Sequence, residues 1–167
     1  VPAIPEANFI VEPEGRGTAP AIGLAAIHLQ ARDPEAIMAV LTADHIIGKP
    51  EVFRSVIRSA LEFARDEYLV TLGIKPTWPS TSYGYIEQAD LLGEKLGFKA
   101  YTAQRFVEKP NAQNAQRMLN MGKYSWNSGM FIWKVRRIME EFKSQMPDLY
   151  AHLMRIADTI GTERYDA

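Results

Sequence analysis

Glu108 and Lys109 stand side by side in the stretch RFVEKP, residues 105–110, directly before a proline. The apolar residues before them predict a β-strand that ends at this pair. Consecutive strand residues normally point to opposite faces. We expect Pro110 to hold Lys109 extended and to end the strand, so that both side chains can bend toward one ligand.

Other predicted strands also end in polar residues. Glu12 follows FIV, Asp44 and His45 follow AVLTA, and Lys75 follows LVTLGI. In open α/β sheets, ligands bind outside the carboxyl ends of the parallel strands. Any single position can be an ordinary polar turn, but the set together favours a ligand-binding crevice.

Asp44 has the most specific chemistry of this set. A carboxylate at the end of a buried strand suits Mg²⁺, which favours one or two carboxylates together with substrate phosphates. The alternative is an aspartate that caps the loop before Pro50. His45 lacks a second His or Cys at ligand spacing, so we expect no zinc site. His28 and His152 lie in predicted helices and are interpreted as structural.

The stretch GRGT, residues 15–18, precedes a predicted helix. Gly15 and Gly17 permit close approach of a backbone, and Thr18 is predicted to be the N-cap. The stretch could therefore hold a ribose, a phosphate or a base edge. It matches neither of the common glycine-rich phosphate-binding patterns, so it is a weak signal by itself.

The apolar pattern predicts the elements that position these residues. Predicted strands cover 8–13, 37–47 and 68–74, and they alternate with helices over 18–33 and 50–67. This order predicts a sheet between layers of helices, with parallel strands in the first half. Further strands are predicted at 83–87, 99–109 and 128–135, and helices at 111–122, 136–146 and 147–161. The longer strands of the second half, 83–87 and 99–109, are expected to be partly exposed, with a polar connection between them, which makes a mixed sheet.

Composition limits the class of protein. The chain has 167 residues, of which 47% are hydrophobic, with 19 basic and 20 acidic side chains. One soluble domain is therefore expected, without nucleic-acid or membrane partners. The chain has no cysteine and no long apolar run, which favours the cytoplasm.

Five blocks of the sequence carry a family resemblance. They are EPEGRGTAPAIGLAA, TADHII, GIKPTWPSTSYGYIE, RFVEKP and WNSGMFIW. Their order and spacing resemble those of sugar-1-phosphate nucleotidylyltransferases, most closely the bacterial mannose-1-phosphate guanylyltransferases. The resemblance implies a Rossmann-like, GT-A-like α/β fold. It also implies a Mg²⁺-dependent reaction in which mannose 1-phosphate attacks the α-phosphorus of GTP, giving GDP-mannose and pyrophosphate.

The resemblance also implies roles for single residues. Glu108 and Lys109 match the residues that bind the sugar hydroxyls and the phosphate, and Lys109 would offset charge between the two phosphates. Asp44 matches the metal-binding aspartate. The other matches are Gly84, Asn127 and Gly129 beside the sugar, and Glu12, Arg16, Thr18 and Ala19 beside the guanine and ribose.

Several departures from the family pattern affect these expectations. Gly17 replaces an asparagine, and the stretch 79–83 reads PSTSY where the family often reads PETGY. The family's N-terminal glycine-rich loop and a second metal-binding aspartate are not found in this chain, which therefore resembles a central fragment of one catalytic domain. We expect the chain alone to be inactive or nearly so. An exposed sheet edge would favour a homodimer.

Two alternatives stay open at this point. The chain could belong to a nucleotidylyltransferase for another sugar or base, which Gly17 and Ser82 keep in view. It could also belong to a regulatory module that binds a sugar nucleotide without catalysis. An enzyme would carry the glycine-rich loop just upstream of residue 1, whereas such a module would lack it.

Overall fold

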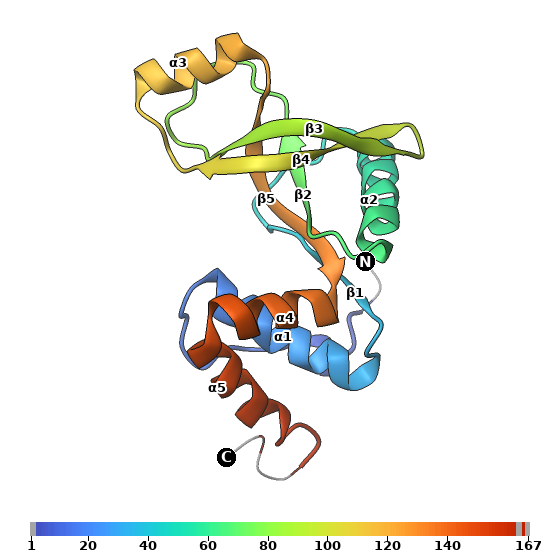
Figure 1. The fold of residues 1–167 in the computed structure, drawn as a ribbon. Helices are drawn as coiled ribbons and strands as arrows, with labels where there is room; N and C mark the ends of the chain where they lie inside the picture. Colours follow the sequence, from blue (N-terminus) through green and yellow to red (C-terminus); the bar gives the residue numbers. More distant parts are fainter. Residues whose placement is uncertain (1–2, 163–164, 166–167) are drawn as a thin grey trace. The chain divides into compact units, whose positions relative to one another are not determined.

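The computed structural model describes residues 3–162 and Tyr165 (Figure 1). Two compact units divide the chain. One unit contains the residues up to Met38 together with those from Trp133 onward, and the other contains Ala39–Ile132. No described helix combines the length and the apolar character that crossing a membrane requires.

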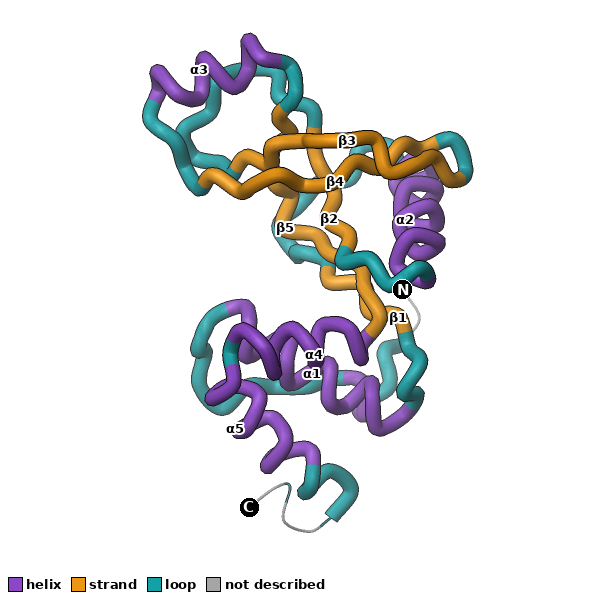
Figure 2. Tube along the Cα trace, in the orientation of Figure 1, coloured by secondary structure: helices purple, strands orange, loops and turns teal. Residues whose placement is uncertain are grey.

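Three helices build the first unit, and each of them packs against the other two. They are α1 (Thr18–Arg32), α4 (Val135–Gln145) and α5 (Pro147–Ala157) (Figure 2). Their buried residues are Ile22, Gly23, Ala26, Ile27, Val135, Ile138, Met139, Phe142 and Leu153. The helices predicted at 18–33, 136–146 and 147–161 are therefore confirmed, with α5 ending a few residues early.

Gly23 allows α1 and α5 to approach closely. A Cβ atom at this position would lie 2.5 Å from Cδ1 of Leu153, which is nearer than carbon atoms can approach. Leu153 is itself only 3% exposed, so its side chain fills the space beside the glycine. The close contact between α1 and α5 therefore depends on glycine at position 23.

The strand predicted at 8–13 is wrong. A short 3₁₀-helix, η1 (Glu6–Asn8), is followed by irregular backbone in which Val11 is 82% exposed. A strand needs a hydrogen-bonded neighbour, and the described residues place none beside this segment. Arg32 instead holds the start of the chain, because its guanidinium donates to Oδ1 of Asn8 at 3.0 Å and to the carbonyl of Ala7 at 2.7 Å.

The strands form a sheet in the order β1-β5-β3-β4, and β2 pairs with β5. Their bounds are β1 (Ile37–Val40), β2 (Val70–Ile74), β3 (Tyr85–Lys95), β4 (Phe98–Val107) and β5 (Tyr124–Lys134). The pairings of β2 with β5, of β3 with β4 and of β3 with β5 are antiparallel. The predicted α/β class is confirmed, although the strand predicted at 37–47 ends at Val40.

The polar connection predicted between the strands at 83–87 and 99–109 is wrong, because β3 and β4 form one long hairpin (Figure 1). Leu96 and Gly97 make its turn, with φ of 51° and 81°. Two-residue turns of this kind need positive φ at both central residues, and leucine is an unusual choice for the first. The residue types at the turn therefore did not indicate it.

Helix α2 (Pro50–Arg65) supports the turn end of this hairpin. Oγ of Ser59 donates to the carbonyl of Lys95 at 2.8 Å, and Nζ of Lys95 donates to the carbonyl of Glu62 at 2.8 Å. The same ammonium group lies 4.9 Å from the ring centroid of Phe63. One lysine at the end of β3 therefore connects the hairpin to the helix.

Helix α3 (Ala112–Met121) supports the other end of the hairpin. The helix predicted at 111–122 is therefore confirmed. Asn111 is the N-cap, since its side chain accepts a hydrogen bond from the N–H of Asn114 at 2.9 Å. Gly122 ends the helix in the left-handed conformation, with φ of 68°. The cluster beneath α3 contains Tyr85, Ala115, Met118, Tyr124 and Trp126, with Val107 packed against it.

Candidate functional site

Gly84, Glu108 and Asn127 meet at one end of the sheet in the second unit. Because β3 lies between β4 and β5, the register places Gly84 between Glu108 and Asn127. The N–H of Asn127 donates to the carbonyl of Gly84 at 2.8 Å. A Cβ atom on Gly84 would lie 2.8 Å from Oε2 of Glu108 and 3.5 Å from Cβ of Asn127. The glycine therefore leaves open the space that a side chain would fill between a carboxylate and an amide.

The side-chain amide of Asn127 has a defined orientation. Its Oδ1 accepts a hydrogen bond from the N–H of Gly129 at 3.0 Å. The hydroxyl of Thr71 also lies 3.5 Å from this oxygen and 3.3 Å from the carbonyl of Met130. Since a backbone donor occupies Oδ1, the NH₂ group of Asn127 is the part left to contact a ligand, and it offers two hydrogen-bond donors.

The backbone turn that orients the side-chain amide of Asn127 needs a glycine at position 129. Its φ is +70°, and a Cβ atom here would lie 3.3 Å from Cγ2 of Thr42. The hydrogen bond from Gly129 to Asn127 closes a turn of the kind that asparagine side chains commonly make with the backbone two residues on. This turn explains why a glycine stands two residues after Asn127.

Glu108 and Lys109 lie beyond the end of β4, whose last residue is Val107. Nζ of Lys109 lies 3.4 Å from Oε1 of Glu108, and both side chains are exposed. The prediction that Pro110 holds Lys109 extended is wrong, because φ of Lys109 is +42°. The chain turns here from the end of β4 toward Asn111 and α3, and the left-handed residue makes that turn possible.

Asp44 lies in a turn four residues beyond the end of β1, with its side chain 87% exposed. Its Oδ1 is 3.3 Å from Nδ1 of His45, which also hydrogen-bonds the hydroxyl of Thr42. Thr42 also lies beside Gly129, so the backbone turn that contains Asp44 adjoins β5. Among the residues the structure describes, no three His, Cys, Asp or Glu side chains form a metal cluster. A single accessible carboxylate fits Mg²⁺ only if substrate oxygens and water supply the other ligands.

The remaining predicted residues, Glu12, Arg16, Thr18 and Ala19, lie in the first unit, around the start of α1. The prediction of Thr18 as N-cap is wrong, because Gly17 holds that position with φ of +95° and Thr18 is the first helical residue. Arg16 pairs with Glu14 at 2.7 Å, and both side chains are exposed. Gly17 has no side chain that could cap α1, and helix starts of this kind are places where backbone N–H groups can bind anions.

An aromatic cluster that the sequence did not indicate lies beside Gly84. The ring of Trp126 is 4.5 Å from that of Trp78 and 5.0 Å from that of Tyr83, measured between centroids. Trp126 is 6% exposed, while Trp78 is 51% exposed. These rings hold the segment before Gly84 in place. The only hint in the sequence was a pair of aromatic residues within a stretch rich in proline and serine.

Glu87 is a second feature that the sequence did not indicate. It is 7% exposed, and Arg105 donates to its Oε2 at 2.7 Å while Lys123 pairs with Oε1. Hydrogen bonds from Lys123, Tyr124 and Arg105 lower the pKa of this carboxyl from 4.5 to about 2, against the opposing effect of burial. Glu87 thus connects β3 to β4 and to the residue before β5.

Residues 3–162 match the model of the nucleotidyl transferase family, and the chain belongs to this family. Among curated proteins, the chain is 44% identical over 144 residues to a mannose-1-phosphate guanylyltransferase of Escherichia coli strain K12. It is 46% identical over 145 residues to one of Salmonella montevideo. These alignments cover 85% and 86% of the chain and about 30% of each relative, so the chain spans about a third of their length.

Two solved structures have a similar fold. A mannose-1-phosphate geranyltransferase from Thermus thermophilus superposes with a TM-score of 0.81 and 32% identity, over 94% of this chain and 44% of that one. A mannose-6-phosphate isomerase from Helicobacter pylori superposes with a TM-score of 0.74 and 28% identity, over 88% of this chain and 53% of that one. The family and the fold agree with the expectation from the sequence.

Proposed function

We propose that this chain supplies the sugar-phosphate-binding part of an enzyme that forms GDP-mannose and pyrophosphate from GTP and mannose 1-phosphate. The observation that carries the proposal is the meeting of Gly84, Glu108 and Asn127 at one end of the sheet. A carboxylate that accepts and an amide that donates, with a gap between them, can bind vicinal hydroxyl groups. The relatives named as mannose-1-phosphate guanylyltransferases support mannose as the sugar.

Each residue then has a chemical task in the proposed reaction. Glu108 accepts hydrogen bonds from sugar hydroxyls, and the NH₂ group of Asn127 donates to the sugar oxygens. The ammonium group of Lys109, which is 64% exposed, offsets the charge of the sugar phosphate as it approaches the triphosphate. Guanine and ribose are assigned to the segment that contains Glu12, Arg16, Thr18 and Ala19.

The proposed bond changes are those of an in-line displacement at phosphorus. An oxygen of the sugar phosphate forms a bond to the α-phosphorus of GTP, and the bond from that phosphorus to the bridging oxygen of pyrophosphate breaks. Asp44 would hold Mg²⁺, which neutralises phosphate charge and helps to align the triphosphate. In this scheme the protein forms no covalent bond with the substrates, so it contributes mainly by positioning them and by offsetting their charge.

Ligand-observed NMR tests the proposal directly. GDP-mannose, ADP-glucose, dTDP-glucose and UDP-N-acetylglucosamine would compete for the chain, with and without Mg²⁺. We expect selective contact with GDP-mannose, strengthened by Mg²⁺ and weakened by Glu108→Gln. The matched control is Glu94→Gln, an exposed carboxylate on β3. A preference for another nucleotide sugar would contradict the assignment of guanine and mannose.

The assembly and the compartment are also proposals. A homodimer is consistent with the apolar side chains that the β3–β4 hairpin exposes, among them Leu91 and Leu96 at 55% and 63% exposure. The cytoplasm is the compartment expected for a chain without cysteine that uses GTP. Light scattering of the purified chain over a range of concentrations tests the dimer.

A further inference from the structure

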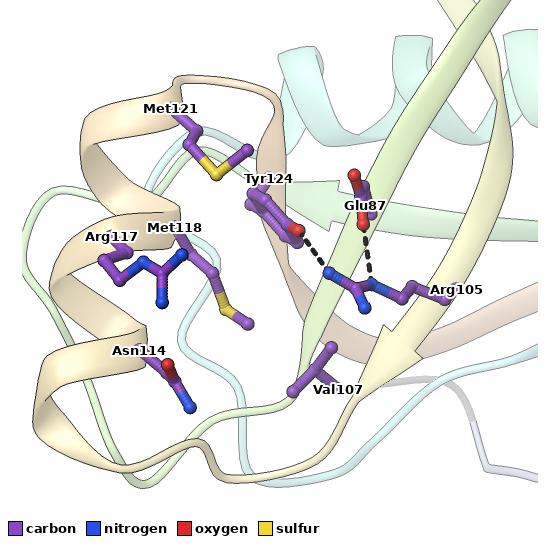
Figure 3. A pocket seen from close by; sticks show the side chains of 8 residues that line it. All are labelled: Glu87, Arg105, Val107, Asn114, Arg117, Met118, Met121 and Tyr124. Atoms are coloured by element: carbon purple, nitrogen blue, oxygen red, sulfur yellow. Dashed lines mark hydrogen bonds and ion pairs between the residues drawn. The ribbon is translucent and has the colours of Figure 1, made fainter.

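A groove of about 350 Å³ lies in the second unit, between α3 and the strands that α3 covers (Figure 3). Its apolar floor contains Val107, Met118, Met121 and Tyr124. Met118 and Tyr124 are also part of the buried cluster beneath α3, whereas Met121 is 55% exposed. The groove is therefore a concave surface with a partly buried apolar floor, a common character of small-molecule sites.

The rim of this groove carries cationic and amide groups. Arg117 and Asn114 come from one face of α3, three residues apart, and Arg105 comes from β4 on the opposite wall (Figure 3). Arg105 is held in place, since its Nε donates to Oε2 of Glu87 at 2.7 Å and its Nη2 donates to the hydroxyl of Tyr124 at 3.0 Å. Its guanidinium group has further N–H donors to offer.

The charges at the rim do not cancel. Glu87 is the carboxylate that lines the groove, and it pairs with both Arg105 and Lys123. The lining residues therefore carry one carboxylate and two guanidinium groups, those of Arg105 and Arg117, while Lys123 pairs with the same carboxylate from outside the lining. This excess of positive charge over an apolar floor favours an anion that carries an apolar body.

The groove is separate from the site at Gly84. Val107 lines the groove, whereas Oε2 of the next residue, Glu108, lies beside Gly84. Tyr85 and Trp126, whose side chains lie in the cluster beneath α3, are the sequence neighbours of Gly84 and Asn127. Successive side chains alternate between the two faces of a sheet, so the two sites use opposite faces. A ligand in the groove would not occupy the proposed sugar site.

We propose that this groove binds a small organic anion, in which a phosphate or carboxylate is joined to a flat apolar body. The guanidinium groups of Arg105 and Arg117 bind the anionic group, because guanidinium forms paired, charge-assisted hydrogen bonds with planar or tetrahedral oxyanions. The flat body lies against the methionine side chains and the ring of Tyr124, whose soft and aromatic surfaces suit it. The proposal rests on the groove alone and does not depend on the reaction proposed above.

The test uses small probes that lack a sugar or a base. Methyl NMR spectra of the methionine side chains would be recorded during titration with phenyl phosphate, benzoate and neutral phenol. We expect phenyl phosphate, benzoate or both to shift the methyl signals of Met118 and Met121 in a saturable manner. Phenol should bind at least about tenfold more weakly, because it cannot form charge-assisted hydrogen bonds. The stronger of the two anions identifies the preferred group.

Two variants make the test specific. Arg117→Gln removes a rim charge from an exposed position and should weaken anion binding about tenfold. Arg58→Gln removes an arginine from α2 that is also exposed and should leave binding unchanged. Circular dichroism checks that both variants are folded. The proposal is overturned if the two methyl signals do not shift, if phenol binds as well as the anions, or if Arg117→Gln binds like the parent.

Discussion

The N–H of Asn127 donates a 2.8 Å hydrogen bond to the carbonyl of Gly84, and this bond joins β5 to the residue that precedes β3. The bond fixes the separation between an amide side chain and a glycine that has Glu108 on its other side. The spacing of Gly84 and Asn127 is therefore set by backbone hydrogen bonding, whereas the carboxylate of Glu108 belongs to an exposed side chain that can move. Substitutions at Gly84 should act on binding more than on stability.

Gly84→Ala should displace the carboxylate of Glu108. The added Cβ would lie 2.8 Å from Oε2, and that oxygen belongs to an exposed side chain that can move away. We expect mannose 1-phosphate to bind at least about tenfold more weakly, with little change in the free energy of unfolding. The matched control is Gly48→Ala, where a Cβ meets nothing within 4 Å and which lies outside the proposed binding residues. Equal affinities for both variants, measured by calorimetry, would contradict the role of Gly84.

The protein should be more stable with glycine than with alanine at position 109. Its φ of +42° lies in the left-handed region, which costs a residue with a side chain about 1 kcal/mol. We therefore expect Lys109→Gly to exceed Lys109→Ala by about 1 kcal/mol in free energy of unfolding from urea denaturation. At Lys99, an exposed position within β4, the order should be reversed. The same order at both positions would refute the strain at Lys109.

Gly23→Ala should destabilise the helices of the first unit. Alanine favours helix formation, but its Cβ would lie 2.5 Å from Cδ1 of Leu153. Overpacking of this kind costs about 1–3 kcal/mol, so we expect a net loss of about 1 kcal/mol. A double-mutant cycle with Leu153→Ala should reveal a coupling of similar size. A variant more stable than the parent would show that helix propensity decides the outcome.

Glu87 should make stability sensitive to acid. Its pKa falls from 4.5 in the unfolded chain to about 2 in the folded protein, chiefly through the hydrogen bond from Lys123. The stabilisation is therefore present above about pH 4.5 and is lost as the pH falls toward 2. Glu87→Gln should lower the stability at neutral pH and flatten its decline over this interval. Urea denaturation at a series of pH values measures both effects, and an unchanged acid profile in the variant would contradict the prediction.

The local signals in the sequence predicted some elements almost completely. Asn111 and Gly122 are residue types that start and end helices, and α3 lies between them as expected. The segment 8–13 shows the opposite case. Its apolar residues suit a strand, but a strand also depends on a neighbour that a local pattern cannot identify. The hairpin turn at Leu96 was missed because leucine is not a typical turn residue.

The candidate site was predictable in part. Gly84, Glu108 and Asn127 were selected from motifs, and the structure brings them together. The backbone of Lys109 was not predictable, because the rule for residues before proline favours an extended conformation. The support from Thr71 and Thr42 was also hidden, since a single hydroxyl in an apolar strand or a turn carries no motif. The roles of Glu12 and Asp44 stay predictions.

The contact between Trp78 and Trp126 gives the protein an optical reporter of its own. The chain has three tryptophans, and the ring centroids of these two lie 4.5 Å apart, beside the segment that leads to Gly84. Trp78 is half exposed and Trp126 is buried, so movement of this segment would change the quenching and the colour of their emission. Intrinsic fluorescence could therefore follow occupancy of the neighbouring site in real time, without any attached dye.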